Sequence, residues 1–112
     1  CGCADPFSAK SLRAGMSAQY VLNIFEGERE KILDLLSCCQ LVCADMSGEN
    51  VFTADIAEKH ALVLGSEGGG VSSAARMRCE KTVSIPMKNN MESLNVAVSA
   101  GILMYLMGKN NF

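Results

Sequence analysis

The sequence predicts an α/β fold in which a parallel sheet carries helices on both faces. Two observations indicate it. Strand-like and helix-like segments alternate along most of the chain, and the run at residues 61–64 is apolar without alternation, as in a strand buried on both faces. Strands separated by helices pair in parallel, because the crossover returns the chain to the same edge of the sheet.

The first 40 residues predict two helices around one strand. Ser8 follows Pro6 and is placed to cap a short helix. Residues 20–25 are rich in β-branched and aromatic side chains, which favour a strand. Residues 26–39 repeat apolar positions every three or four residues, which predicts a helix.

The rest of the chain predicts three more strands and two more helices. The strands are expected at residues 41–44, 61–64 and 83–85, with a polar connection at 47–54. One helix follows a cap at Ser72 or Ser73, and the last covers residues 93 to about 107 and is apolar almost all round. No linker or repeat interrupts the pattern, so a single domain is expected over residues 1–112.

The charge balance gives no sign of a nucleic-acid-binding protein. Ten basic and twelve acidic side chains leave a net charge of −2. A strongly basic field is therefore missing. If the protein binds RNA, the phosphate contacts must come from a local patch, a dimer or another domain.

The cysteines predict free thiols rather than disulfides or a metal site. No Cys-x-x-Cys pair occurs, and the single His60 has no partner at zinc-finger spacing. The apolar content is sufficient for a core without bridges, which indicates a cytoplasmic protein. The six cysteines are Cys1, Cys3, Cys38, Cys39, Cys43 and Cys79.

No segment predicts a membrane location. The longest apolar stretch, residues 94–107, contains two polar residues and is too short to span a bilayer. No signal peptide is visible. Because the chain opens on Cys1 rather than methionine, we expect it to be part of a longer protein that continues upstream.

A glycine-rich turn at residues 65–72 follows the buried strand. Its two-glycine spacing is that of a phosphate-binding loop, but Val71 replaces the lysine and Glu67 would repel a triphosphate. The dinucleotide fingerprint is also incomplete. Glycines after a buried strand indicate a close approach of backbone or ligand, so a tight turn and a ligand site remain equal alternatives.

A second polar cluster opens the last helix. Ser93 and Asn95 precede an apolar run, where unpaired amides and the helix dipole attract anions. Ser93 alone is explained equally well as a helix cap. Asn95 has no intrinsic advantage inside a helical turn and needs a partner.

Together these segments resemble the SpoU/TrmH family of RNA ribose 2′-O-methyltransferases. Residues 62–72, LVLGSEGGGVS, are similar to the family's second motif. Residues 85–87, IPM, followed by ESLNVAVSAGI at 92–102, are similar to the third. The family usually has a glycine where this chain has Asn89, and asparagine tolerates the left-handed backbone that such a position requires.

The resemblance implies a SPOUT fold with a C-terminal trefoil knot whose loops bind S-adenosylmethionine without a metal. Gly65, Ile85 and Leu94 would contact this methyl donor, and Gly68 and Met87 would line the same pocket. The resemblance also implies a homodimer, formed through helices beside the knot, and a structured RNA partner, tRNA or rRNA, rather than DNA or a membrane.

The implied reaction moves a methyl group to a ribose 2′-hydroxyl, with Glu67, Ser93 and Asn95 at the target ribose or shaping the catalytic pocket. The family assigns proton removal to an arginine of its first motif, which has no counterpart in residues 1–112, and Arg13 is no substitute. This chain alone is therefore expected to be inactive. One alternative is a non-catalytic cofactor-binding or dimerisation fragment, and another is a generic α/β domain with an incidental glycine turn.

Overall fold

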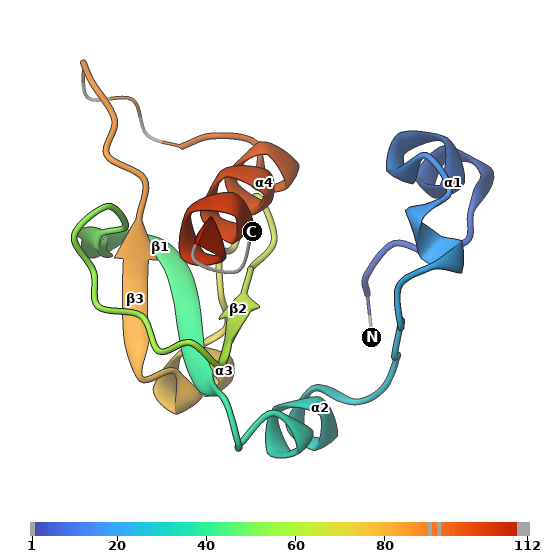
Figure 1. The fold of residues 1–112 in the computed structure, drawn as a ribbon, viewed down its shortest axis with the longest axis horizontal. Helices are drawn as coiled ribbons and strands as arrows, with labels where there is room; N and C mark the ends of the chain where they lie inside the picture. The colour runs from blue at the N-terminus through green and yellow to red at the C-terminus, as the bar shows by residue number, and fades with distance from the viewer. Residues whose placement is uncertain (1, 90, 92, 110–112) are drawn as a thin grey trace. The chain divides into compact units, whose positions relative to one another are not determined.

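The computed structural model describes residues 2–89, 91 and 93–109 (Figure 1). The chain divides into two compact units, Cys1–Asp34 and Leu35–Phe112. Each unit is described by itself. The prediction of one domain over residues 1–112 stays a prediction.

The first unit is built around helix α1, Ala9–Gly15. As predicted, Ser8 caps it: the Ser8 Oγ accepts a hydrogen bond from the Ser11 amide at 3.2 Å. A 3₁₀ turn, η1, Ala18–Tyr20, follows. Gln19 connects it to α1, because its Nε2 donates a hydrogen bond to the Ser11 carbonyl at 2.7 Å.

The prediction of a strand at residues 20–25 is wrong. Tyr20 ends η1, and residues 21–25 are exposed and belong to no strand. β-branched and aromatic side chains favour a strand only where a neighbouring strand supplies the ladder and a surface to pack against. The described residues of this unit, 2–34, contain no strand that could supply the ladder.

The second helix, α2, is Arg29–Leu35, shorter than the helix predicted at residues 26–39. Its one buried side chain is Leu33. A turn follows the helix, and in it the Cys39 amide donates to the Leu36 carbonyl at 2.9 Å.

The second unit contains the predicted parallel sheet, in the order β2-β1-β3 (Figure 1). Val42 on the central strand pairs with Leu62 on one side and Lys81 on the other. The strands are β1, Gln40–Asn50, β2, His60–Val63, and β3, Lys81–Ser84.

Strand β1 is much longer than predicted, and the first part of the expected connection at 47–54 is strand. The ladder with β3 breaks after Ala44 and resumes at Glu49. Gly48 makes this possible, since a Cβ there would lie 2.6 Å from the carbonyl carbon of Thr82. A side chain would force the two strands apart at the bulge.

Helices cover both faces of the sheet, as predicted. On one face, Val42 and Val83 form a buried cluster with Leu103 of helix α4, Val96–Met107. On the other, helix α3, Ser73–Arg78, reaches β1 through an ion pair between Arg76 and Asp45. Before the bulge, the even and odd residues of β1 therefore face different helices.

Candidate functional site

A cavity of about 580 Å³ opens at the carboxyl ends of the parallel strands. Ligands bind at this edge in open α/β sheets, because the loops that leave the strands converge there. Four segments line it: the bulge of β1, the glycine turn after β2, the end of β3 with its loop, and the start of α4. The lining residues are Ala44, Asp45, Met46, Ser66, Glu67, Gly70, Val83, Ser84, Ile85, Met87, Ser93, Leu94, Asn95, Val96, Ser99 and Leu103.

The glycine turn is closed by hydrogen bonds between its own residues. The Gly70 amide donates to the Ser66 carbonyl at 2.9 Å, and the Gly69 amide donates to Ser66 Oγ at 3.1 Å. Gly70 adopts a left-handed backbone with φ of 65°. A side chain there would be strained, so this turn favours glycine.

Gly65 lies where the turn closes on itself. A Cβ at this position would be 1.9 Å from the Gly70 carbonyl carbon and 2.2 Å from the Val71 nitrogen. The glycine is therefore required by the protein's own backbone. Of the two alternatives that the spacing left open, the structure shows the tight turn directly.

Gly65 and Gly68 do not belong to the described lining of the cavity. An added Cβ on Gly68 would have no neighbour within 4 Å. Their contact with a ligand stays a prediction, whereas every other predicted site residue lines the cavity.

The predicted apolar contacts lie together. Ile85 and Met87, just beyond β3, and Leu94, before α4, line the cavity, and each is half-buried. In the loop between them, Asn89 has a φ of 60°, so the left-handed backbone expected at this position is present.

Asn95 joins the last helix to the glycine turn. Its Oδ1 accepts from the amides of Ala97 at 2.9 Å and Val98 at 3.3 Å, so Asn95, and not Ser93, caps α4. Its Nδ2 donates to Glu67 Oε1 at 2.9 Å. The prediction that Asn95 lies inside a helix beginning at residue 93 is therefore wrong: α4 begins at Val96, and Asn95 is its cap, where asparagine is favoured. Glu67 is an additional partner of its side chain, and Ser93 is left facing the cavity.

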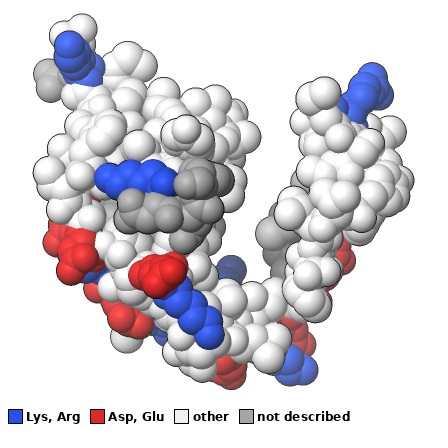
Figure 2. Space-filling model, in the orientation of Figure 1, with Lys and Arg blue, Asp and Glu red and all other residues white. Residues whose placement is uncertain are grey.

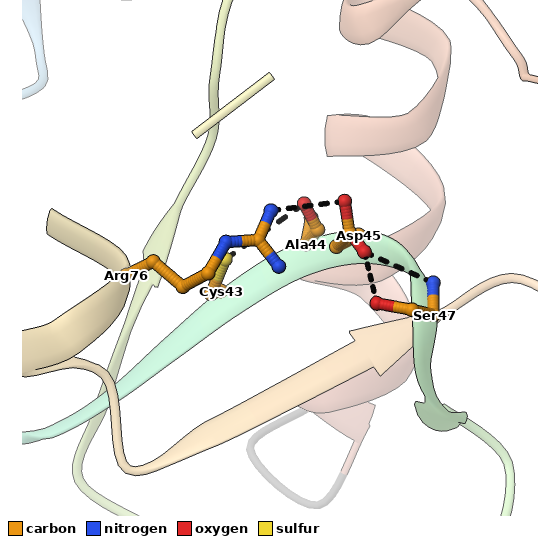
Figure 3. A network of polar contacts seen from close by, with 5 residues as sticks. All are labelled: Cys43, Ala44, Asp45, Ser47 and Arg76. Carbon is orange, nitrogen blue, oxygen red and sulfur yellow. Dashed lines mark hydrogen bonds and ion pairs between the residues drawn. The ribbon is translucent and has the colours of Figure 1, made fainter. Parts of the chain in front are cut away.

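One feature of the site was not predicted from the sequence. Asp45 lines the cavity and is held by Arg76 of α3, whose Nη2 donates to Asp45 Oδ1 at 3.0 Å (Figure 3). The hydroxyl and the amide of Ser47 both donate to Asp45 Oδ2. The hydrogen bond from the Arg76 guanidinium is the main reason why the pKa of the Asp45 carboxyl lies well below its usual range, and the hydrogen bonds from Ser47 lower it further. The available signal was an acidic residue directly after the strand predicted at 41–44.

Among the described residues, the charged side chains that line the cavity are both acidic, Asp45 and Glu67. On the face drawn in Figure 2, basic side chains lie singly among acidic and uncharged ones. Because Arg76 compensates the charge of Asp45, the Glu67 carboxylate is what makes the cavity favour a cationic small molecule over a phosphate.

The family model for SpoU rRNA methylases matches residues 1–105. The chain belongs to this family. It is 30% identical over 107 residues to the 23S rRNA (guanosine(2553)-2′-O)-methyltransferase RlmP of Bacillus subtilis, covering 93% of this chain and 43% of that protein. It is 40% identical over 62 residues to the 23S rRNA (guanosine-2′-O-)-methyltransferase RlmB of Ralstonia nicotianae, which covers 55% of this chain and 25% of that protein.

Solved structures of SpoU methyltransferases have the same fold. The methyltransferase AviRb of Streptomyces viridochromogenes, in complex with AdoMet, superposes with a TM-score of 0.86 at 29% identity, covering 97% of this chain and 47% of that one. An AdoMet-bound rRNA methyltransferase from Sinorhizobium meliloti, at 23% identity and a TM-score of 0.88, supports the fold alone. This SpoU chain spans a quarter to about half of the relatives named above.

Within the described residues of this SpoU chain, no group of three or more His, Cys, Asp or Glu side chains could hold a metal ion. None of its described helices is long and apolar enough to cross a membrane. Cys3, Cys38, Cys39, Cys43 and Cys79 are free thiols, and Cys1 lies outside the described residues.

Proposed function

We propose that the chain is the S-adenosylmethionine-binding part of an RNA ribose 2′-O-methyltransferase. The observation that carries this proposal is the cavity at the strand ends, where the two motifs meet through the Asn95–Glu67 hydrogen bond. The family membership and the AdoMet-bound relative give the chemistry that such a cavity would serve.

The cavity fits S-adenosylmethionine in size and character. Its volume of about 580 Å³ lies within the range of small-molecule pockets. Ile85, Met87 and Leu94 offer apolar surface to an adenine ring and a methionine chain. Glu67 offers negative charge to a sulfonium or an ammonium group, whereas the charge of Asp45 is compensated by Arg76.

When bound, this donor supplies a methyl group on a cationic sulfur. The chain's part is to hold the donor, exclude water and leave room for a ribose hydroxyl. Glu67, Ser93 and Asn95 line the cavity together, and we assign them to the target ribose. The Asn95 amide orients the Glu67 carboxylate, which can accept a hydroxyl proton during transfer.

We propose structured RNA, rRNA or tRNA, as the substrate and the cytoplasm as the location, where free thiols persist. We further propose a homodimer with the trefoil knot of the family. Exposed apolar side chains of α4, Val98 and Met104, support a partner surface. Light scattering would test it: a monomeric, folded protein would contradict the dimer.

Calorimetry with S-adenosylmethionine tests the central claim. Leu94→Gln, inside the cavity, should weaken binding roughly tenfold, since it places an unpaired amide against the ligand. Met77→Gln, on an α3 side chain that is 86% exposed, is the matched control and should bind as the unmutated chain does. Equal affinities in both variants would overturn the site.

The second candidate is a non-catalytic cofactor-binding or dimerisation fragment. It is favoured by one observation: neither lysine nor arginine is among the described residues that line the cavity, so the cation that the family uses near the hydroxyl is not supplied there. Transfer of labelled methyl from the donor to rRNA and tRNA decides between the two. Binding without transfer would support the fragment, and transfer would support the enzyme, with Glu67→Gln the first variant to test.

A further inference from the structure

Two adjacent thiols lie in the turn that joins α2 to β1. The sulfurs of Cys38 and Cys39 are 3.9 Å apart, close enough for one thiol to donate to the other. Cys38 is exposed and Cys39 is half-buried. Two backbone hydrogen bonds fix the conformation of this turn. The Cys39 amide donates to the Leu36 carbonyl, and the amide of the next residue, Gln40, donates to the Lys59 carbonyl at 3.0 Å.

The surroundings separate the two thiols chemically. The hydrogen bond from Cys39, followed by the nearby Lys59 ammonium, lowers the pKa of the Cys38 thiol. Burial and the same sulfur–sulfur contact raise the pKa of Cys39. Cys38, the exposed one, is therefore the more acidic thiol of the pair.

Two further thiols of the second unit, Cys43 on β1 and Cys79 at the end of α3, are in the opposite situation. Cys43 is fully buried and Cys79 is half-buried between β1 and α3. Burial raises the pKa of both, that of Cys79 to about 11. A buried, protonated thiol is a poor nucleophile, so these two serve as internal references.

We propose that Cys38 is a modification site at which the exposed thiol, assisted by Cys39 and Lys59, exchanges with low-molecular-mass disulfides. The Cys38 sulfur attacks one sulfur of the disulfide. The new Cys38 sulfur–sulfur bond forms as the old one breaks, and the leaving thiolate takes up a proton to become a thiol. The Cys38 thiol is oxidised to a mixed disulfide, while half of the reagent is reduced.

The site is separate from the cavity. Cys38 precedes the amino end of β1, whereas the cavity lies at the carboxyl ends of the strands. A group attached to Cys38 should therefore leave S-adenosylmethionine affinity unchanged. This separates failure of the modification from failure of the proposed function.

The test uses the whole chain with limiting glutathione disulfide and, in a second arm, the uncharged reagent 4,4′-dithiodipyridine. Peptide mapping by mass spectrometry then locates the modified cysteine. We expect Cys38 to react first, more than tenfold faster than Cys79. It should also react several-fold faster than Cys3, which is exposed too but lacks such neighbours among the contacts described. A tenfold gain in thiolate yields about a threefold gain in exchange rate.

Three variants make the inference specific. Cys38→Ser should remove the fast phase. Cys39→Ala, which removes the donor, and Lys59→Gln should each slow it several-fold without changing the melting temperature. A reaction of Cys38 no faster than that of Cys3 would overturn the proposal. So would an unchanged rate in both Cys39→Ala and Lys59→Gln, because the neighbours would then contribute nothing.

Discussion

Asn95 makes two kinds of contact from a single side chain: its oxygen caps α4, and its nitrogen donates to Glu67 Oε1 at 2.9 Å. The residues are 28 positions apart, and the bond fixes the glycine turn against the start of the last helix. One wall of the cavity therefore depends on this contact.

Replacing Asn95 by aspartate should separate the two roles. Aspartate keeps the cap and suits the helix dipole, but it brings a second carboxylate up to Glu67. We expect Asn95→Asp to weaken S-adenosylmethionine binding at least tenfold with little loss of helix stability. Asn95→Ala should instead cost about 1 kcal/mol of unfolding free energy through the lost cap. Calorimetry and thermal unfolding measure the two effects, and full affinity in Asn95→Asp would refute the role of the contact.

Alanine at Gly65 should be severely destabilising. Its Cβ would overlap the Gly70 backbone at 1.9 Å, which no rotamer change relieves, so we expect a loss of at least about 3 kcal/mol. Gly68→Ala is the matched control in the same turn. Its Cβ meets nothing within 4 Å, and its stability should change by less than about 1 kcal/mol. Urea unfolding distinguishes them, and similar stabilities would be inconsistent with the closed turn.

Asp45→Asn should destabilise the protein in a pH-dependent way. Because the folded state holds the pKa of this carboxyl below its unfolded value of about 3.9, its contribution is complete above that pH and is lost as pH falls below it. The pair is partly exposed, so we expect a loss of about 1 kcal/mol or less at pH 7, and a smaller one at pH 3.

A double-mutant cycle with Arg76→Gln checks the cause of that loss. The two substitutions should be less than additive in urea unfolding at pH 7, because either one breaks the same ion pair. Strict additivity, or a loss from Asp45→Asn that is equal at both pH values, would exclude the pairing as its source.

Substitution of Leu103 on α4 should destabilise the core strongly, whereas substitution of its neighbour Met104 should have little effect. Leu103 is 1% exposed and packs against Val42 and Val83, so Leu103→Ala should cost about 2–5 kcal/mol. Met104 is 58% exposed, and Met104→Ala should change the stability of the monomer by about 0.5 kcal/mol or less. A large concentration-dependent loss for Met104→Ala would place that residue in the dimer interface.

Much of the second unit could be predicted from local patterns. The apolar run ending at Gly65 gave β2, and Ser72 was correctly placed as a possible helix cap. These features depend on residues that are close to one another in the chain, so they can be predicted from the sequence. Residues 20–25 have the composition of a strand but no strand beside them, so propensity alone predicted a wrong element there.

By itself, the sequence determined the parallel α/β class, the family and six of the residues that line the cavity, because motif spacing and apolar runs are written along the chain. Only the tertiary structure decided which residues pair across it. It showed that Arg76 pairs with Asp45, 31 positions away, and that Asn95 donates a hydrogen bond to Glu67. It also showed that the backbone of Gly70 leaves no room for a side chain at Gly65. Such contacts depend on how strands and helices meet in space, and no local preference of either partner specifies them.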